Sequence, residues 1–216
     1  MGMKEILDNF RTGRHEFENG HLEDIHEIKP QDLFEEWMTE AVEAKELEPN
    51  AFVLSTVDTD GQASSRIVYL KDIIEEEFVL YTNYKSDKGK DLESNNKVSM
   101  LFFWPKSSRQ IRIKGGCTKL DAATSDAYFE TRPRYSKLGA WASDQSATLE
   151  NRSDLESKVK ELDEKFDEVV PRPDFWGGYK IHATSYEFWQ GRPSRLHDRI
   201  VFDRVDGTWK MYRINP

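Results

Sequence analysis

The sequence predicts an α+β protein in which an antiparallel β-barrel is covered by helices. About eight segments rich in aromatic and β-branched residues have the pattern of strands, and helical segments lie among them. Their order shows no regular alternation of strand and helix, which disfavours a parallel sheet. Aromatic residues make up 12% of the 216-residue chain and supply the bulk for a sizeable core.

The chain begins with a polar stretch, residues 1–30, that we expect to be a loosely ordered arm with a short helical turn. Pro30 then opens a segment, 30–47, in which apolar residues recur at helical spacing and acidic residues come early. This is the pattern of an amphipathic helix. No internal repeat, low-complexity tract or linker follows, so residues 31–216 are predicted to form a single domain.

The remaining elements follow in chain order. Asp60 and Gly61 predict the tight turn of a β-hairpin, and Ser86 is a suitable N-cap for a short helix. A later helix is expected to end near Thr131, because Arg132 precedes a proline. We predict strands over 51–58, 63–73, 77–83, 97–104, 109–120, 179–191, 195–204 and 208–214. We predict helices over 86–95, 121–131, 134–143 and 152–166.

Composition restricts the class of partner and the compartment. The net charge of −9 argues against nucleic-acid binding, which depends on an excess of Lys and Arg. Charged residues make up 33% of the chain, and mean hydropathy is −0.77. No apolar run is long enough for a membrane span, and the N-terminus lacks the apolar region of a signal peptide. With Cys117 as the single cysteine, no internal disulfide forms, and we expect a cytoplasmic protein.

Several familiar site motifs are absent from the sequence. There is no GxGxxG, GxxxxGK[ST], GxSxG or CxxC pattern, so dinucleotide folds, P-loops, the hydrolase elbow and zinc ribbons lack support. His15, His21 and His26 lie among acidic residues, but their spacing fits no regular ligand geometry. We interpret them as part of a solvated arm and predict no metal site.

A cationic stretch near the C-terminus, "EFWQGRPSRLHDRIVF" (187–202), is unusual for a strand. His197 stands beside Asp198, but adjacent side chains of a strand point to opposite faces, so a catalytic dyad is disfavoured. The same alternation predicts that Arg195, His197 and Arg199 form a row on one face. The alternative is a solvent-facing polar strand. Arg192, in the turn, is expected to be solvated.

Two further clusters of polar residues point to an anionic ligand. "SSRIVYLKD" places Arg66 and Lys71 in an otherwise apolar strand. Tyr128 and Arg132 are four residues apart at a helix end, and Ser136 begins the next helix, where free N–H groups favour an anion. Such a convergence is suited to a phosphate monoester. The clusters together predict two anionic ligands, or one ligand with several polar ends.

These segments resemble the pyridoxine/pyridoxamine 5′-phosphate oxidases, a family of flavoenzymes. "EFWQGRPSRLHDR" matches the family's C-terminal signature, and "RIVYLK", "YTNYKSDKGK", "RQIRIKG", "YFETRPRYSKLGAWAS" with "DQS", and "FWGGY" are similar to its other blocks in the same order. The resemblance implies an FMN-binding split barrel and a homodimer with FMN at the subunit interface. It implies oxidation of pyridoxamine 5′-phosphate and pyridoxine 5′-phosphate to pyridoxal 5′-phosphate, with O2 as acceptor and H2O2 as product.

Position by position, the resemblance implies a role for particular residues. FMN contacts fall to Arg66, Ile67, Val68, Tyr69, Leu70, Lys71, Tyr81, Thr82, Lys88, Gln110, Gln145, Ser146, Trp189 and Arg199. The substrate phosphate falls to Lys71, Tyr128, Arg132 and Ser136. The substrate's pyridine ring falls to Arg195, Leu196 and His197, of which Arg195 and His197 are the predicted catalytic residues. Since Arg66 and Lys71 differ in strand parity, both serve one site only if Lys71 lies at a bulge or past the strand's end.

Two positions depart from the family's pattern. Asp87 stands where the family usually has Arg near the flavin phosphate; we interpret it as turning outward to cap its helix, and expect Arg66 and Lys88 to hold FMN. In the arm, Arg14 matches a segment that can cover the active site, whereas Phe17 lacks the hydroxyl of the usual Tyr. The alternatives are a split-barrel flavin reductase or oxidase acting on another substrate, and a non-catalytic carrier of FMN or pyridoxal phosphate.

Overall fold

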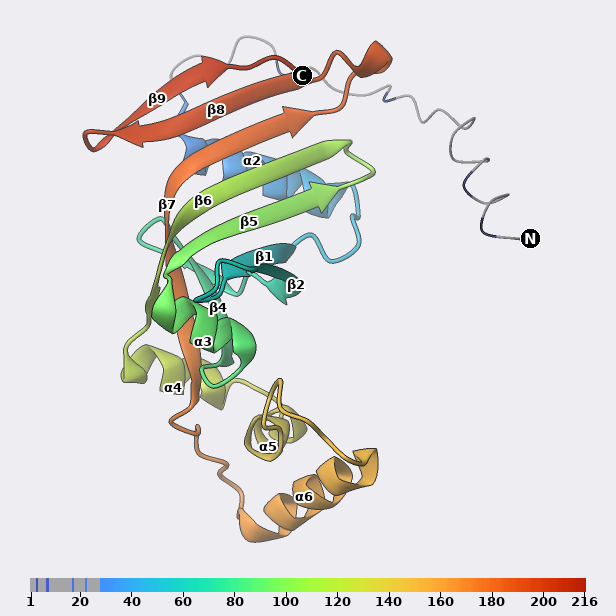
Figure 1. The fold of residues 1–216 in the computed structure, drawn as a ribbon, viewed down its shortest axis with the longest axis vertical. Helices are drawn as coiled ribbons and strands as arrows, with labels where there is room; N and C mark the ends of the chain where they lie inside the picture. The colour runs from blue at the N-terminus through green and yellow to red at the C-terminus, as the bar shows by residue number, and fades with distance from the viewer. Residues whose placement is uncertain (1–2, 4–6, 8–16, 18–21, 23–27) are drawn as a thin grey trace. The chain divides into compact units, whose positions relative to one another are not determined.

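The computed structural model describes residues 3, 7, 17, 22 and 28–216, so Arg14 and the three arm histidines lie outside the described residues. Its helices are α2 (Pro30–Glu43), α3 (Asp87–Ser94), α4 (Ala122–Glu130), α5 (Arg134–Ala142) and α6 (Arg152–Lys165), as shown in Figure 1. Its strands are β1 (Ala51–Val57), β2 (Ala63–Tyr69), β3 (Asp72–Ile74), β4 (Glu77–Asn83), β5 (Lys97–Trp104), β6 (Arg109–Lys119), β7 (Trp176–Gln190), β8 (Asp198–Val205) and β9 (Thr208–Arg213).

The strands form one nine-stranded sheet with the order β2-β1-β5-β6-β7-β4-β3, and β8 pairs with both β7 and β9. Pairing is antiparallel between β1 and β2, β1 and β5, β3 and β4, β4 and β7, and β8 and β9. Each predicted strand and helix is present, but the strand predicted over 63–73 is wrong at its end: β2 ends at Tyr69, and Asp72–Ile74 form the separate short strand β3. The boundaries of β8 differ from the prediction in a way that matters for the site.

Packing divides the chain into two compact units. Unit 1 comprises Met1–Pro49, Phe102–Arg112 and Tyr186–Pro216, and unit 2 comprises Asn50–Leu101 and Ile113–Ser185. Strands β5, β6 and β7 each contribute residues to both units. The single domain expected over residues 31–216 stays a prediction.

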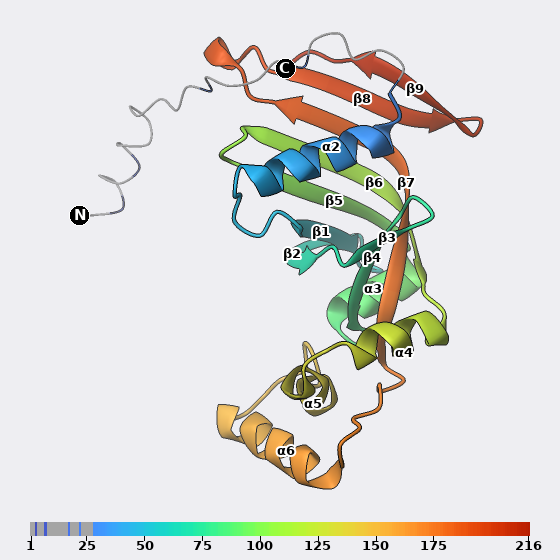
Figure 2. The same ribbon diagram turned by 180° about the vertical axis from the view of Figure 1, so that it is seen from behind.

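The core of unit 1 forms where α2 lies across the sheet, as Figure 2 shows. Leu33, Phe34, Trp37 and Ala41 of α2 recur at helical spacing and are buried. Phe34 packs edge-to-face against Phe102 with ring centroids 5.2 Å apart, and Trp37 packs in the same way against Phe188, also at 5.2 Å. The amphipathic pattern of the sequence therefore fixes which face of the helix contacts the sheet.

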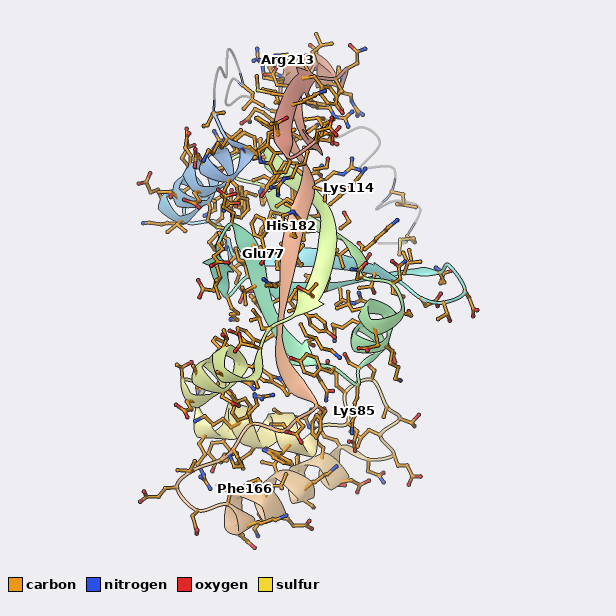
Figure 3. The ribbon with its side chains drawn as sticks, turned by 90° about the vertical axis from the view of Figure 1, so that its left-hand side faces the viewer. Glu77, Lys85, Lys114, Phe166, His182 and Arg213 are labelled. Atoms are coloured by element: carbon orange, nitrogen blue, oxygen red, sulfur yellow. The ribbon has the colours of Figure 1, made fainter. Side chains whose placement is uncertain are left out.

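Unit 2 has its core around β1, β4 and the adjoining parts of β6 and β7. Strand β1 alternates between buried and half-buried residues, whereas Phe78, Val79 and Leu80 of β4 are all buried. In the β4–β7 pair, the Glu77 carboxylate forms an ion pair with Lys180 Nζ at 2.5 Å and lies 3.5 Å from His182 Nδ1 (Figure 3). These polar contacts support the register of the β4–β7 pair, in which Phe78 lies opposite Ile181.

Ser86 and Cys117 occupy defined local environments in unit 2. The side chain of Ser86 accepts a hydrogen bond from Gly89 N, so Ser86 is the N-cap of α3, as predicted. Cys117 on β6 is 5% exposed, and its burial raises the pKa of the thiol to about 12.

None of the helices in the described part of the chain has the length and apolar composition needed to span a bilayer.

Candidate active site

A cavity of about 470 Å³ in unit 2 brings together the residues predicted to hold a phosphate. Lys71, Tyr128, Arg132 and Ser136 all line it, beside three residues predicted to contact the flavin, Tyr81, Thr82 and Gln145. The lining also includes Asn83, Thr131, Pro133 and Trp176, for which the sequence suggested no role. We call this cavity the phosphate pocket.

The residues that line the phosphate pocket lie at or beyond the ends of elements, where their side chains can face a ligand. Strand β2 ends at Tyr69, so Lys71 lies past the strand's end, which removes the conflict of parity with Arg66. Tyr128 is on the last turn of α4, and Arg132 follows its end at Glu130. Ser136 lies in the first turn of α5, where its N–H donates to Pro133 O at 2.9 Å.

Arg132 is half-buried, and its Nη1 atom is buried without a hydrogen-bond partner. Its guanidinium lies 4.4 Å from the ring centroid of Trp176 and 5.4 Å from that of Phe129. Burial lowers the pKa of Arg132, and the neighbouring Tyr128 opposes this shift, but an arginine remains charged throughout the physiological range. A buried, charged donor without an acceptor is costly, so this atom is poised for an anionic ligand.

The charge of the phosphate pocket contrasts with that of the whole chain. Asp and Glu outnumber Lys and Arg by 40 to 31 in the sequence. Among the described residues that line the pocket, Lys71 and Arg132 are cations and none is a carboxylate. A positive pocket in an acidic protein is a specific site for a small anion rather than part of a basic surface.

Three aromatic rings form one wall of the pocket. Tyr81 and Tyr128 are stacked with centroids 3.8 Å apart and planes within 7°, and the nearly parallel ring of Trp176 lies beside this pair, 5.6 Å from Tyr81 and 6.2 Å from Tyr128. Burial, helped by the negative charge of Asp72, raises the pKa of Tyr81 to about 12. Both tyrosines therefore keep neutral hydroxyl groups, which can donate hydrogen bonds to an anion.

A second pair of cations lies in unit 2 on β2 and α3. Arg66 Nη1 donates to Thr56 Oγ1 at 2.7 Å, and Arg66 Nη2 lies 3.9 Å from the carboxylate of Asp91. Lys88 Nζ donates to Gln145 Oε1 at 2.7 Å. The pKa of Lys88 is lowered by burial and, secondarily, by the positive charge of Arg66. Two half-buried cations that repel each other would be stabilised by an anion between them.

The loop of Gln145 and Ser146 contacts this second cation pair. Gln145 Oε1 also accepts from Thr82 Oγ1 at 3.3 Å, so the amide is held between β4 and α3. Ser146, with a positive φ of 75°, accepts a hydrogen bond from Asp87 N at 3.2 Å. The predicted flavin residues Thr82, Lys88 and Gln145 thus form one hydrogen-bonded group.

The interpretation of Asp87 as a helix cap is wrong. Ser86 occupies the N-cap position, so Asp87 is already the first residue of α3. The Asp87 side chain is exposed and lies 3.5 Å from Lys90 Nζ. It faces outward as expected, and its charge raises the pKa of Lys88, against the larger lowering by burial and by Arg66.

The other predicted flavin residues of β2 and the following link lie on an open strand. Ile67 is 66% exposed and Tyr69 is 39% exposed, whereas Val68 and Leu70 are half-buried. Strand β2 pairs only with β1, so it is an edge of the sheet. Exposed apolar side chains on an edge strand favour a further contact beyond this chain.

The remaining predicted site residues lie in unit 1. They are Gln110, Trp189, Arg195, Leu196, His197 and Arg199.

The prediction of a strand over 195–204 is wrong at its start, because β8 begins at Asp198. Pro193–Arg195 form a short 3₁₀ turn, in which Ser194 and Arg195 have positive φ values of 58° and 61°. Two successive residues in this conformation end any strand pattern. Arg195, His197 and Arg199 therefore do not form a row on one strand face, and Arg195 is presented from an exposed turn.

The prediction that Arg192 is solvated is wrong. Its side chain holds the turn in place. Its Nη1 pairs with Asp198 Oδ2 at 2.9 Å, and both side chains are largely buried. Asp198 also accepts from Leu22 N at 3.2 Å, and Arg213 lies 3.5 Å from its other oxygen. Asp198 is thus an anchor for the turn rather than a partner of His197.

The backbone of Arg192 fixes the state of His197. Arg192 N donates to His197 Nδ1 at 3.0 Å, which leaves the ring proton on Nε2 when the imidazole is neutral. Burial, and then the charge of Arg195, lowers the pKa of His197. The ring lies 4.6 Å from that of Trp189 and 5.4 Å from that of Phe17. His197 is therefore a neutral hydrogen-bond donor near pH 7.

Arg199 shares one carboxylate with Arg112. Glu187 Oε1 accepts from Arg199 Nε at 2.9 Å and from Arg199 Nη2 at 2.7 Å, while Glu187 Oε2 accepts from Arg112 at 3.1 Å. Glu187 is only 12% exposed at its side chain. Its negative charge offsets part of the charge on both arginines, which leaves them mainly as oriented donors.

The sequence reasoning missed Trp176, Glu187 and Asp198 as supporting residues. Glu187 stood in the quoted C-terminal stretch, where its position 12 residues before Arg199 gave no signal of pairing. Trp176 lies in the quoted "FWGGY" block, but its contact with Arg132 depends on how β7 approaches the α4–α5 link. Asp198 was noticed, but as the neighbour of His197.

Known structures share this fold. The chain superimposes with a TM-score of 0.87 and 28% identity on the structure of PhzG from Burkholderia lata in complex with tetrahydrophenazine-1-carboxylic acid, covering 94% of this chain and all of that one. A pyridoxamine 5′-phosphate oxidase-related, FMN-binding protein from Nostoc punctiforme gives 0.70 with 14% identity, over 88% of this chain and all of that one. The fold class is thus an α+β split barrel, as expected.

Sequence comparison identifies the family. A model described as pyridoxamine 5′-phosphate oxidase matches residues 38–166, and one described as the pyridoxine 5′-phosphate oxidase C-terminal dimerisation region matches 176–216. Pyridoxine/pyridoxamine 5′-phosphate oxidases from Leptospira biflexa and Cytophaga hutchinsonii are 51% and 50% identical, covering 87% of this chain and 89% and 88% of theirs. The chain therefore belongs to the pyridoxamine 5′-phosphate oxidase family.

Proposed function

We propose that this protein oxidises pyridoxamine 5′-phosphate and pyridoxine 5′-phosphate to pyridoxal 5′-phosphate, with FMN as cofactor and O2 as electron acceptor. The single observation that carries the substrate class is the phosphate pocket. It presents Arg132 with a buried Nη1 atom without a partner, beside Lys71 and two neutral tyrosine hydroxyls. A phosphate monoester supplies the charge and the acceptor oxygens that this set of donors lacks.

The residues of unit 2 also fit the phosphate end of FMN. Arg66 and Lys88 are held close enough for the charge of one to lower the pKa of the other, and Gln145 and Ser146 add polar groups beside them. We infer that these four residues hold the cofactor's phosphate. FMN held by these residues would supply the hydride acceptor for oxidation at C4′ of the substrate and would pass the two electrons on to O2 to give H2O2.

The reacting end of the substrate falls to the turn of unit 1. Arg195 is exposed and cationic at the tip of the turn, and His197 is a neutral donor through Nε2. We propose that Arg195 orients the pyridine ring and stabilises charge that develops on it, while His197 fixes the ring by a hydrogen bond. Hydride loss from C4′ needs no prior proton abstraction from carbon, so neither residue has to act as a base there. The hydroxyl proton of pyridoxine 5′-phosphate passes to water, and the iminium formed from pyridoxamine 5′-phosphate is hydrolysed to the aldehyde and ammonia.

We further propose a cytoplasmic homodimer with FMN at the subunit interface. The match to a dimerisation region over residues 176–216 supports a dimer. The exposed apolar side chains of Ile67 and Tyr69 on the edge strand β2 support an interface at this strand, next to the cation pair of the cofactor site. The single, buried cysteine is consistent with a reducing compartment.

The test measures oxygen consumption and peroxide release by the purified yellow protein. We expect one H2O2 for each pyridoxal 5′-phosphate formed from pyridoxine 5′-phosphate. Unphosphorylated pyridoxine should react with a kcat/KM lower by about 100-fold or more, because the cations of the phosphate pocket then lack their partner.

Other results would identify the alternatives. Oxidation of tetrahydrophenazine-1-carboxylic acid in place of pyridoxine 5′-phosphate would indicate an oxidase for a different substrate. A yellow protein that consumes no oxygen with either would be a carrier. A colourless protein that takes up no FMN would refute the cofactor.

A further inference from the structure

Trp176 begins β7 and is 7% exposed, and it lines the phosphate pocket. The guanidinium of Arg132 lies over its ring, with 4.4 Å between the guanidinium carbon and the ring centroid. The tyrosine stack of Tyr81 and Tyr128 runs parallel to the same indole, within 9° and 6°. The indole therefore has one flat surface beneath the cation and is itself fixed by neighbouring rings.

The support of Arg132 differs from that of the other half-buried arginines in the described part of the chain. Those arginines have a carboxylate within ion-pair distance: Arg66, Arg109, Arg112, Arg134, Arg172, Arg192 and Arg199. Arg109 is the closest parallel, since it too lies over an indole, that of Trp37 at 4.3 Å. However, Arg109 Nη1 also pairs with Glu40 at 2.5 Å, whereas Arg132 has aromatic partners alone among the described residues.

We propose that Trp176 is a positioning residue for the substrate phosphate: its indole face holds the Arg132 guanidinium flat in the pocket without neutralising it. A carboxylate in this place would orient the guanidinium equally well, but it would cancel the charge and occupy the donor edges that the phosphate needs. A ring face attracts the cation through its quadrupole and leaves those edges free. The inference rests on the proposed function and names the device that gives its phosphate specificity.

The experiment compares Trp176→Leu and Trp176→Phe with the natural holoprotein, using pyridoxine 5′-phosphate as substrate and inorganic phosphate as competitor. Trp176→Leu should raise KM for the substrate and the inhibition constant of phosphate by about tenfold each, with kcat and FMN content little changed. Trp176→Phe should recover most of both, because it restores an aromatic face. Trp209→Leu is the matched control, since Arg204 lies over Trp209 at 5.8 Å in unit 1, and it should change neither constant.

A second series separates the ring's electrostatics from its packing. Fluorinated tryptophans placed at position 176 keep the shape of the indole but weaken its negative face, so phosphate affinity should fall with each added fluorine. An unchanged KM in Trp176→Leu, failure of Trp176→Phe to recover it, or a flat response to fluorination would each overturn the proposal.

Phosphate binding to the holoprotein, measured by calorimetry, requires no turnover. If the natural protein fails to oxidise pyridoxine 5′-phosphate, the proposed function fails. The role of Trp176 is then decided by whether Trp176→Leu weakens phosphate binding.

Discussion

Arg132 of the phosphate pocket and the arginines around the turn of unit 1 are supported in different ways. In the phosphate pocket of unit 2, Arg132 rests on Trp176 and Phe129, and its Nη1 has no acceptor. In unit 1, Arg192 pairs with Asp198, and Arg199 pairs with Glu187. An aromatic support leaves the full charge available to a ligand, whereas a carboxylate converts the arginine into an oriented but largely neutralised donor. On the proposed function, the site in unit 2 attracts an anion and the turn of unit 1 orients a polar ring.

Removal of Arg132 should have the largest effect. We expect Arg132→Gln to lower kcat/KM for pyridoxine 5′-phosphate on the order of 1000-fold, mainly through KM, because a buried charge pair with the phosphate is lost. FMN content should stay unchanged, since Arg66 and Lys88 are separate from the pocket lining. Steady-state kinetics check this, with Arg152→Gln on the exposed face of α6 as the control. An equal loss with unphosphorylated pyridoxine would contradict the comparison.

Arg195 offers an exception within unit 1, because it is exposed at a turn that two positive φ angles define. Arg195→Leu should lower kcat about 100-fold while FMN stays bound, as expected for loss of a group that stabilises developing charge. The same substitution should raise the pKa of His197, since the charge of Arg195 is one cause of its depression. Proton NMR titration, with His197→Asn to assign the resonance, measures this shift. Unchanged turnover would remove Arg195 from the site.

The smallest effect is expected from a change at Glu187. It tests arginines whose charge is offset by a carboxylate. Glu187→Gln removes the charge shared by Arg112 and Arg199, and should lower the free energy of unfolding by about 1–2 kcal/mol. We expect FMN to bind about fivefold more weakly if Arg199 contacts it. Denaturant unfolding and FMN titration measure both. Glu156→Gln, which breaks an exposed pair with Arg152, should change stability by less than about 0.5 kcal/mol.

The parts of the site that the sequence predicts are those whose geometry is set by residues close together in the chain. Tyr128, Arg132 and Ser136 were expected to converge because the end of one helix and the start of the next are set by nearby sequence, notably the proline after Arg132. The turn of Arg195 was missed because Ser194 and Arg195, neither of them glycine, adopt positive φ, which a strand pattern of side chains does not reveal. The roles of Glu187 and Trp176 depend on contacts between distant segments.

The fold shows the same division. Helix α2 and the β1–β2 hairpin follow directly from periodicity and a turn motif, and both were predicted. Strand β3 has three residues, too few to show a period, and its existence depends on pairing with β4. The strand order, in which β1 neighbours β5 and β4 neighbours β7, is a property of the assembled sheet.

The burial of Cys117 has a consequence for durability. The proposed reaction releases peroxide at every turnover, and peroxide attacks thiolates far faster than thiols. Burial raises the pKa of Cys117 to about 12, so the side chain is a thiol at pH 7, and the residue is 5% exposed. The single cysteine of the chain is thus protected, by burial and by its neutral thiol, from the peroxide that the proposed reaction releases.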